Sequence, residues 1–360
     1  MWLLNTCSLE MNEFISHKQA PPYAILSHTW GNEEVLFRDW QYGSWEIVEK
    51  KEGFNKIKHC CEQAAAEGLQ WVWIDTCCIN KDSSAELTEA INSMFQWYKS
   101  AAVCYVYLYD ISDDIESNIA KSRWITRGWT LQELIAPREV VFYSCNWEAL
   151  GTRSSLSACL AIVTNINEPF LVGRRDLNEA SIAQRMSWAA RRTTSREEDE
   201  AYCLLGIFNV NMPLIYGEGL KAFRRLQEVL AREYPKDHSL FAWGKPVKRL
   251  SNEVDLHQAY GLEPLDIQHN PDEVGKGGLG LLAKRPRDFQ HSGQIVCTPY
   301  PQHYYLRPGL KTISMLAGDA VHVNLPTVRG VVIAKHLRRP PIGKYPVYYV
   351  AFFDISLAIK

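Results

Sequence analysis

Long apolar runs are missing from this sequence. No stretch approaches the ~18–20 consecutive apolar residues that a helix needs to cross a bilayer. The N-terminus begins Met1-Trp-Leu-Leu-Asn5 and lacks the basic start and long apolar segment of a secretory signal. We therefore expect neither a membrane span nor a signal peptide.

The sequence also has little excess charge. Its formal net charge is −2 over 360 residues, so no bulk attraction to nucleic acid or to an anionic membrane follows. We expect no nucleic acid partner. Internal repeats and low-complexity segments are missing too.

Metal-binding cysteine spacing is a further absence. The ten cysteines include the adjacent pairs Cys60-Cys61 and Cys77-Cys78 but form no Cys-x-x-Cys. Most of them sit inside apolar segments, as small core residues do. This usage predicts a reducing, cytoplasmic location and no structural metal.

What the chain does have is ordinary globular composition at a length that suits two or three domains. Hydrophobic residues make up 46% and charged residues 22%. The 12 tryptophans suit large cores or stacking surfaces, and composition does not choose between these.

Strand-like and helix-like segments alternate over residues 23–145. Apolar runs at 23–27, 71–74, 103–109 and 139–143 read as buried strands, and amphipathic patterns between them read as helices. This alternation predicts an α/β domain with a mainly parallel sheet, over residues 1–150.

The rest of the chain changes character twice. Residues 151–238 show helical periodicity and predict a helical subdomain. Residues 239–360 consist of short apolar runs separated by Gly, Pro and Asn, which predicts a β-rich C-terminal module.

Three polar clusters follow predicted strands: Ser27-His28, Asp75 with Asn80, and the turn that carries Trp129 and Glu133. In parallel sheets ligands bind beyond the carboxyl ends of strands, so we expect these clusters on one rim.

Trp129 and Glu133 are four residues apart, which puts them on one face of a helix that Thr126 would cap. An aromatic ring beside a carboxylate, with Arg127 just upstream, suits a ligand that carries sugar and phosphate. The alternative is a core tryptophan and a surface glutamate paired with an arginine.

Several of these segments together resemble a known family. Tyr23-Ala-Ile-Leu-Ser-His-Thr-Trp-Gly31, Trp73-Ile-Asp-Thr-Cys-Cys-Ile-Asn80 and Arg127-Gly-Trp-Thr-Leu-Gln-Glu133 resemble the fungal HET (heterokaryon incompatibility) domain in order and spacing, over roughly residues 20–150. Later segments, such as Ile215-Tyr-Gly-Glu-Gly219, look like the region that commonly follows it. The family is linked to non-self recognition between fungal cells and to programmed cell death.

HET domains are in turn similar to TIR domains, which have a flavodoxin-like α/β fold. Many TIR domains cleave NAD between nicotinamide and ribose, and their catalytic segment is Ser-x-Trp-Cys-x-x-Glu. Here Trp129 and Glu133 keep that spacing, while Arg127 stands at the Ser position and Thr130 at the Cys position. The resemblance therefore implies that Glu133 is the catalytic carboxylate.

The same resemblance implies that NAD is a substrate, with no bound cofactor. Residues expected at the substrate are Ser27, His28, Trp30, Asp75, Asn80, Arg127 and Trp129. Each of these residues could instead have a purely structural role; Asp75 and Asn80, for example, could brace the loop at the rim. Two functions stay open: an NAD-cleaving effector that assembles into a homo-oligomer, with a possible upstream sensor protein, or a non-catalytic module that self-associates and triggers death through partners.

Overall fold

A computed structural model of the chain describes residues 1–244, 282–295, 313–315 and 321–323. They divide between two compact units: unit 1 contains Met1–Leu177 and Arg192–Gly219, and unit 2 contains Asn178–Arg191 and the described part of Leu220–Lys360. Within this part of the chain, no helix has the length and apolarity required for a membrane span. The three-part division at residues 150 and 238 stays a prediction, and most of the predicted β-rich module lies outside the described residues.

Unit 1 is built on a seven-stranded sheet of order β2-β1-β4-β3-β5-β6-β7. In that order the strands are Met11–Glu13, Trp2–Asn5, Trp71–Trp73, Ala24–His28, Val103–Tyr107, Val140–Tyr143 and Ala149–Thr152. The strands predicted at 23–27, 71–74, 103–109 and 139–143 are therefore confirmed, within one or two residues at their ends.

The sheet is mixed, so the prediction of a mainly parallel sheet holds only at its centre. β4, β3, β5 and β6 pair in parallel, while β1 pairs antiparallel with β2 and β4, and β6 pairs antiparallel with β7. The outermost pairs, β1 with β2 and β6 with β7, are antiparallel because their connections are short: residues 144–148 between β6 and β7 leave no room for a crossover helix. β1 and β2 lie in residues that gave no strand pattern.

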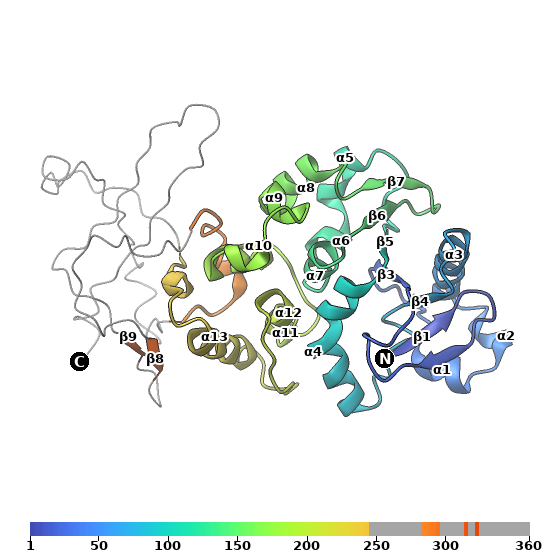
Figure 1. Cartoon of the computed structure of the whole chain (residues 1–360), viewed down its shortest axis with the longest axis horizontal. Coiled ribbons are helices and arrows are strands. Elements are labelled where there is room, and N and C mark those ends of the chain that lie inside the picture. Colours follow the sequence, from blue (N-terminus) through green and yellow to red (C-terminus); the bar gives the residue numbers. More distant parts are fainter. Residues whose placement is uncertain (245–281, 296–312, 316–320, 324–360) are drawn as a thin grey trace, which may run out of the picture. The chain divides into compact units, whose positions relative to one another are not determined.

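Central strands and flanking helices account for the core of unit 1. β3 is buried along its whole length, as expected for a strand covered on both faces. Figure 1 shows α4 (Ser84–Ser100), α6 (Arg123–Thr126) and α7 (Thr130–Ile135) on one side of the sheet and α3 (Glu52–Ala66) on the other. Helix α4 buries an apolar face that includes Met94 and Tyr98.

The strand order reverses at β3. The chain passes from β3 through α3 to β4 on one side, then through α4 to β5 on the other side of β3. Such a reversal leaves a crevice beyond the carboxyl ends of the two neighbouring strands, which is where ligands bind in open α/β sheets. The residues that follow β3 and β5 therefore border the expected ligand rim.

The remaining elements of unit 1 are short. They are α1 (Phe37–Tyr42), α2 (Trp45–Val48), α5 (Ile115–Asn118), the 3₁₀ turn η1 (Ile119–Lys121), α8 (Ser157–Thr164), α9 (Glu168–Leu171), α11 (Asp199–Tyr202) and α12 (Leu205–Phe208).

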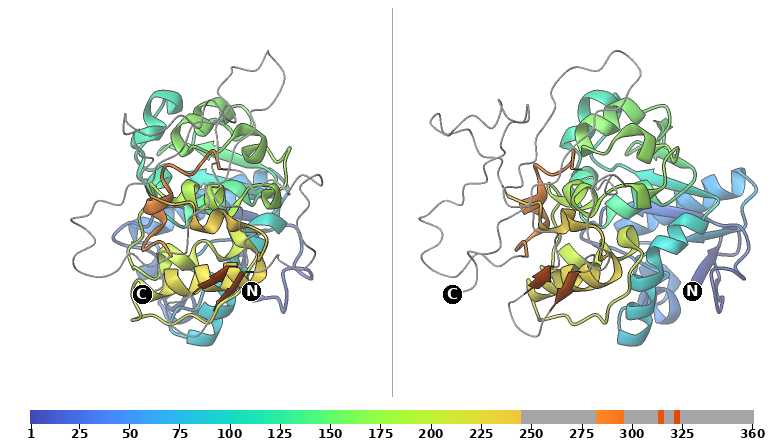
Figure 2. Two further views of the ribbon diagram at one scale, coloured as in Figure 1. Left: turned by 90° about the vertical axis from the view of Figure 1, so that its left-hand side faces the viewer. Right: turned by 60° about the vertical axis from the view of Figure 1, so that its left-hand side comes forward.

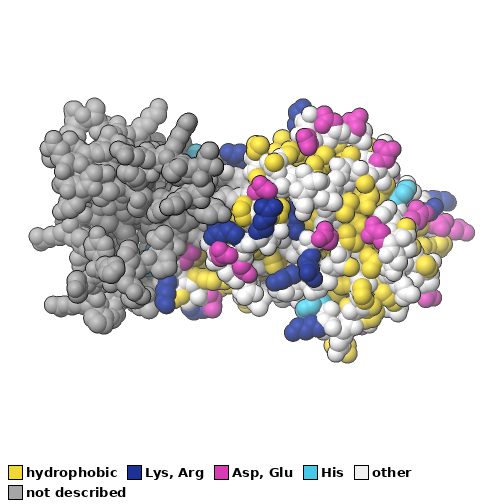
Figure 3. Space-filling view, turned by 45° about the horizontal axis from the view of Figure 1, so that its top comes forward, with side chains coloured by type: hydrophobic (Ala, Val, Ile, Leu, Met, Phe, Trp, Pro, Cys, Tyr) yellow, Lys and Arg dark blue, Asp and Glu magenta, His cyan; other side chains and the backbone are white. Residues whose placement is uncertain are grey.

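Two further views of the ribbon are given in Figure 2. On the face in Figure 3, acidic and basic side chains are scattered among hydrophobic ones, in keeping with the small net charge.

Unit 2 contains the helices α10 (Ile182–Ala189) and α13 (Lys221–Glu233), the 3₁₀ turns η3 (His238–Phe241) and η5 (Pro286–Phe289), and a strand pair, β8 (Ile313–Met315) with β9 (Val321–Val323). The 3₁₀ turn η2 (Leu177–Glu179) lies where the chain passes from unit 1 to unit 2. Ser181 and Gln184 form a reciprocal capping box at the start of α10. In α13 the Gln227 amide bonds both backbone groups of Ala283.

Candidate functional site

The stretch that leads to Glu133 is two short helices with a break between them. Ser122 caps α6, because its hydroxyl accepts from the backbone N–H of Trp124 at 3.2 Å. Helix α7 then begins at Thr130, directly after Trp129. The prediction of Thr126 as the cap of this helix is wrong, since Thr126 is the last residue of α6.

Gly128 explains the break. Its N–H donates to the Thr193 carbonyl at 2.9 Å, and the Thr193 N–H donates to the Thr126 carbonyl at 2.7 Å. A Cβ at position 128 would lie 2.5 Å from Thr194 Cγ2 and 3.2 Å from Cys203 Sγ. Only glycine allows this close approach, so the segment from residue 192 onward is part of the structure that shapes the site.

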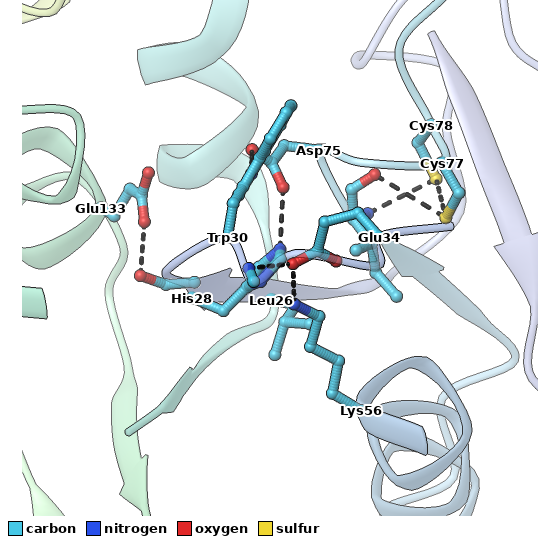
Figure 4. Close-up of polar contacts among 12 residues, drawn as sticks. Leu26, His28, Trp30, Glu34, Lys56, Asp75, Cys77, Cys78 and Glu133 are labelled. Carbon is cyan, nitrogen blue, oxygen red and sulfur yellow. Dashed lines mark hydrogen bonds and ion pairs between the residues drawn. The ribbon is translucent and has the colours of Figure 1, made fainter. Parts of the chain in front are cut away.

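Glu133 is held from β3. The Ser27 hydroxyl donates to Glu133 Oε2 at 2.5 Å (Figure 4). The Trp124 indole donates to the same Ser27 oxygen at 2.7 Å. Glu133 is 6% exposed. A strand end and two helices thus converge on one buried carboxyl group.

Burial raises the pKa of Glu133 to about 8, from an ordinary value of 4.5. The Ser27 hydrogen bond and the charges of Arg127 and Arg192 lower this pKa, while the Asp75 carboxylate raises it. The desolvation effect is the largest, so Glu133 carries a proton through most of the neutral range. Burial and the nearby Glu133 carboxylate also raise the pKa of Tyr98.

Arg192 ties the second segment to the turn. Its Nη1 donates to the Arg127 carbonyl and to the Thr130 hydroxyl, both at 2.8 Å. Its Nη2 is buried and has no hydrogen-bond partner among the described residues. Burial lowers the pKa of this guanidinium to about 10, and the Glu133 charge raises it. Arg192 therefore keeps its charge at neutral pH.

A second cluster is centred on Asp75, just beyond β4. His28 Nε2 lies 2.9 Å from Asp75 Oδ1, and the Trp30 indole donates to Oδ2 at 2.8 Å (Figure 4). Lys81 donates to the Asp75 carbonyl at 2.8 Å, and its ammonium lies 3.7 Å from the Trp30 ring centroid.

Burial alone would raise the pKa of Asp75, but its hydrogen bond with His28, the His28 and Lys81 charges and the Trp30 hydrogen bond outweigh it. The pKa of Asp75 is consequently held well below its ordinary value. The two carboxyl groups of the site therefore differ: Asp75 is ionised at neutral pH, while Glu133 is mostly protonated. Opposite shifts of this kind separate the tasks of two carboxyl groups in one site.

The structure brings Ser27, His28, Trp30 and Asp75 to the rim near Glu133, and it leaves other expected residues elsewhere. The Asn80 amide donates to Glu86 at 3.0 Å and braces the loop before α4. Arg127 donates to the Ser195 hydroxyl at 3.1 Å, although its charge still acts on Glu133. Burial raises the pKa of Asp199, a residue in α11, and the Trp129 side chain lowers it.

Trp124, Tyr98, Lys81 and Arg192 contribute to the site without having been expected there. Trp124 lies three residues before the resembling segment Arg127–Glu133. Tyr98 belongs to the helix before the strand at 103–109, which also resembles the family, but it was read there as part of an apolar face. Arg192 had no local signal, because it meets the 127–130 turn from a segment more than 60 residues away in sequence.

Comparison with known proteins first identifies a family for part of the chain. Residues 23–116 match the family described as heterokaryon incompatibility protein (HET), in agreement with the resemblance in the sequence. This match covers β3 to β5 and ends before Glu133. Residues 221–317 match a second family, described as a domain of unknown function (DUF8212).

One relative makes the comparison more specific. Vegetative incompatibility protein HET-E-1 of Podospora anserina is 49% identical over 225 residues, which cover 59% of this chain and 16% of that protein. The chain thus spans about a sixth of the length of this relative. No solved structure matches the chain.

Proposed function

We propose that this HET-domain protein is an effector of fungal non-self recognition and cell death that cleaves NAD between nicotinamide and ribose. One observation carries the proposal: a buried carboxyl group, Glu133, is held by Ser27 beside the point where the strand order reverses. Its substrate would be NAD itself, with no further cofactor.

A single carboxylate suffices for this reaction. Most glycoside hydrolases need two carboxyl groups because the leaving oxygen must be protonated. Nicotinamide in NAD is already cationic, so the C1′–N1 bond breaks with its electron pair going to the ring nitrogen. An ionised Glu133 stabilises the positive charge that develops on the ribose. Water then adds at C1′ and loses a proton, which gives nicotinamide and ADP-ribose.

The raised pKa of Glu133 suits a cationic ligand. In the free protein a group with a pKa of about 8 is mostly protonated at pH 7. A cationic ring beside it favours the ionised form, so binding of NAD releases a proton from Glu133. Low polarity around the carboxylate strengthens its attraction for the developing charge.

The topology supports the likeness to TIR domains on which this activity rests. Across the sheet, the four parallel strands lie in the order β4-β3-β5-β6. If these four strands are numbered 1 to 4 along the chain, with β3 as strand 1, the order is 2-1-3-4. This is the strand order of flavodoxin-like sheets up to their fourth strand. The relative named as a vegetative incompatibility protein supports the cellular role. Assembly into a homo-oligomer and control by a sensor protein complete the proposal.

The test is nicotinamide release from NAD by the purified full chain, measured in a sample whose assembly state is established by light scattering. Glu133→Gln keeps size and hydrogen-bonding capacity but cannot ionise. Glu139→Gln, an exposed position shortly beyond α7, is the matched control. Release by wild type and by Glu139→Gln, with loss in Glu133→Gln, supports the proposal; no release from an assembled wild-type sample rejects it.

The burial of Glu133 favours a second candidate function. A carboxyl group that is 6% exposed and bonded to Ser27 is also suited to fixing β3 against α7 in a non-catalytic signalling module. In that case the module self-associates and causes death through partners. Expression of Glu133→Gln in fungal cells separates the two, because killing by this variant at wild-type level requires the non-catalytic function.

A further inference from the structure

Unit 1 contains a cleft of about 640 Å³ beyond the carboxyl ends of β3, β5 and β6. Its walls come from residues 29–34 after β3, the first turns of α3, Tyr107 and Tyr109 near the end of β5, and Trp147. Glu133 is not among the lining residues. The volume is that of an ordinary small-molecule site.

Two buried polar atoms at this cleft have no hydrogen-bond partner among the described residues. They are Thr29 Oγ1 and Glu34 Oε2, on side chains whose residues are 6% and 7% exposed. The other Glu34 oxygen is already used, because it accepts from the Gly31 N–H and from Lys56 Nζ, both at 2.5 Å. Buried polar atoms are nearly always satisfied, so unmet ones on a cleft wall point to a ligand.

Gly53 allows the backbone of α3 to lie close to this oxygen. A Cβ at position 53 would lie 2.9 Å from Glu34 Oε2 and 2.7 Å from the Glu33 carbonyl. The first turn of α3 therefore approaches Glu34 with its backbone alone. The carboxylate is fixed on one side by Lys56, while its second oxygen remains able to accept a hydrogen bond.

The cleft also offers aromatic surface. Tyr109 is 48% exposed and lines it together with Trp30. Trp147 stacks on Tyr107 at 5.2 Å and on His59 at 5.7 Å between ring centroids. Trp147 has φ 62°, a left-handed conformation that is rare for a bulky residue, and it stands in the tight turn between β6 and β7.

The charges of the walls select a class of ligand. Glu33, Glu34 and Glu52 all line the cleft, and Lys56 is neutralised by Glu34, so a phosphate inside it would be repelled. A planar ring fits the aromatic surface, and a hydroxyl or amino group fits the free carboxylate oxygen. Arg123, an exposed lining residue, is available to a phosphate attached to such a group.

We propose that this cleft binds a ribonucleoside, with the base on Trp30 and Tyr109 and the ribose hydroxyls bonded to Glu34 and Thr29. The nucleoside is either the adenosine half of NAD, in which case the inference rests on the proposed function, or a separate nucleoside ligand. The chain connects the cleft to Glu133 directly: Thr29 lies two residues beyond Ser27, and Arg123 precedes Trp124.

The experiment uses calorimetric titration of the full chain carrying Glu133→Gln, with adenosine and NAD as separate ligands. Thr29→Val removes the unmet hydroxyl, and Tyr109→Ala removes exposed aromatic surface. The matched controls are Thr88→Val and Tyr42→Ala, which lie outside the cleft. We expect adenosine to bind, at least tenfold weaker binding in each cleft variant, and unchanged binding in each control.

Absence of adenosine binding, or equal dissociation constants in the cleft variants and controls, overturns the inference. If adenosine and NAD compete, the cleft binds the adenosine half of NAD. If both bind at the same time, the cleft binds a separate nucleoside. If Thr29→Val fails to fold by its melting curve, Tyr109→Ala decides, because that side chain is already half in solvent. The titration measures binding and not nicotinamide release. A negative result therefore overturns the nucleoside site without deciding whether the protein cleaves NAD.

Discussion

The Ser27 hydroxyl donates a hydrogen bond of 2.5 Å to Glu133 across 106 residues of sequence. It joins the end of β3 to α7, and Trp124 fixes the same hydroxyl from α6. The contact sits where the strand order reverses, and it fixes the position of a carboxyl group whose pKa burial has raised.

Stability should depend on the ionisation of Glu133. Its pKa is about 8 in the folded protein against 4.5 ordinarily, so the folded state binds the extra proton between these values. Stability from this group is present below pH ~4.5 and is lost as pH rises through 8, on the order of a few kcal/mol. Glu133→Gln cannot ionise, so its free energy of unfolding should fall less than that of wild type between pH 5 and 9. The free energy of unfolding is measured by urea titration at each pH. If it changes equally with pH in wild type and in Glu133→Gln, Glu133 is not a buried, protonated group.

Arg192 should lower the pH at which Glu133 ionises. Its charge lowers the pKa of Glu133, so Arg192→Gln should raise that pKa above about 8. The measurement is the carboxyl resonance of isotope-labelled glutamate followed against pH in the ligand-free protein. Arg196→Gln is the control, because this arginine lies over Tyr216 at 4.5 Å and is not among the groups that act on Glu133. An unchanged titration midpoint in Arg192→Gln would contradict the assignment.

Gly128→Ala should destabilise unit 1 by about 1–3 kcal/mol, because the new methyl group would lie 2.5 Å from Thr194 Cγ2. Adding Thr194→Ser removes that methyl group and should restore part of the loss. Gly31→Ala is the control, since its Cβ would meet only Glu34 Oε1, at an ordinary 3.6 Å. The melting temperatures of the three variants decide; equal losses in Gly128→Ala with and without Thr194→Ser would exclude this contact as the cause.

Asp75→Asn should weaken the rim. The substitution removes the carboxylate that bonds His28 and Trp30, and the expected loss is about 1–3 kcal/mol at pH 7. The pKa of Asp75 is depressed in the folded state, so its contribution is present above the ordinary value of 3.8 and is lost as pH falls below it. The difference from wild type should therefore shrink towards pH 3. A difference that grows on acidification would show that Asp75 does not stabilise as an anion.

The centre of the fold could be predicted because its strands are buried on both faces and read as continuous apolar runs. β1 and β2 could not, since both are short: β2 lies at the edge of the sheet, and β1 is held between β2 and β4, a strand more than 60 residues further along the chain. Of the site, Ser27, Asp75 and Glu133 were found from motifs at strand ends and from family spacing. The roles of Arg192 and Gly128 come from a contact between two segments that are distant in the sequence. A local sequence pattern cannot predict such a contact.

The central claim is that an ionised Glu133 stabilises the ribose cation formed from NAD. The most direct measurement compares kcat/KM for nicotinamide release by wild type and Glu133→Gln in equally assembled samples. Removal of one preorganised electrostatic group costs ~100–1,000-fold in other enzymes, and we predict a loss of at least that size, with wild-type kcat/KM rising with pH towards 8. Equal rates for the two proteins, or no release by assembled wild type, would contradict the account.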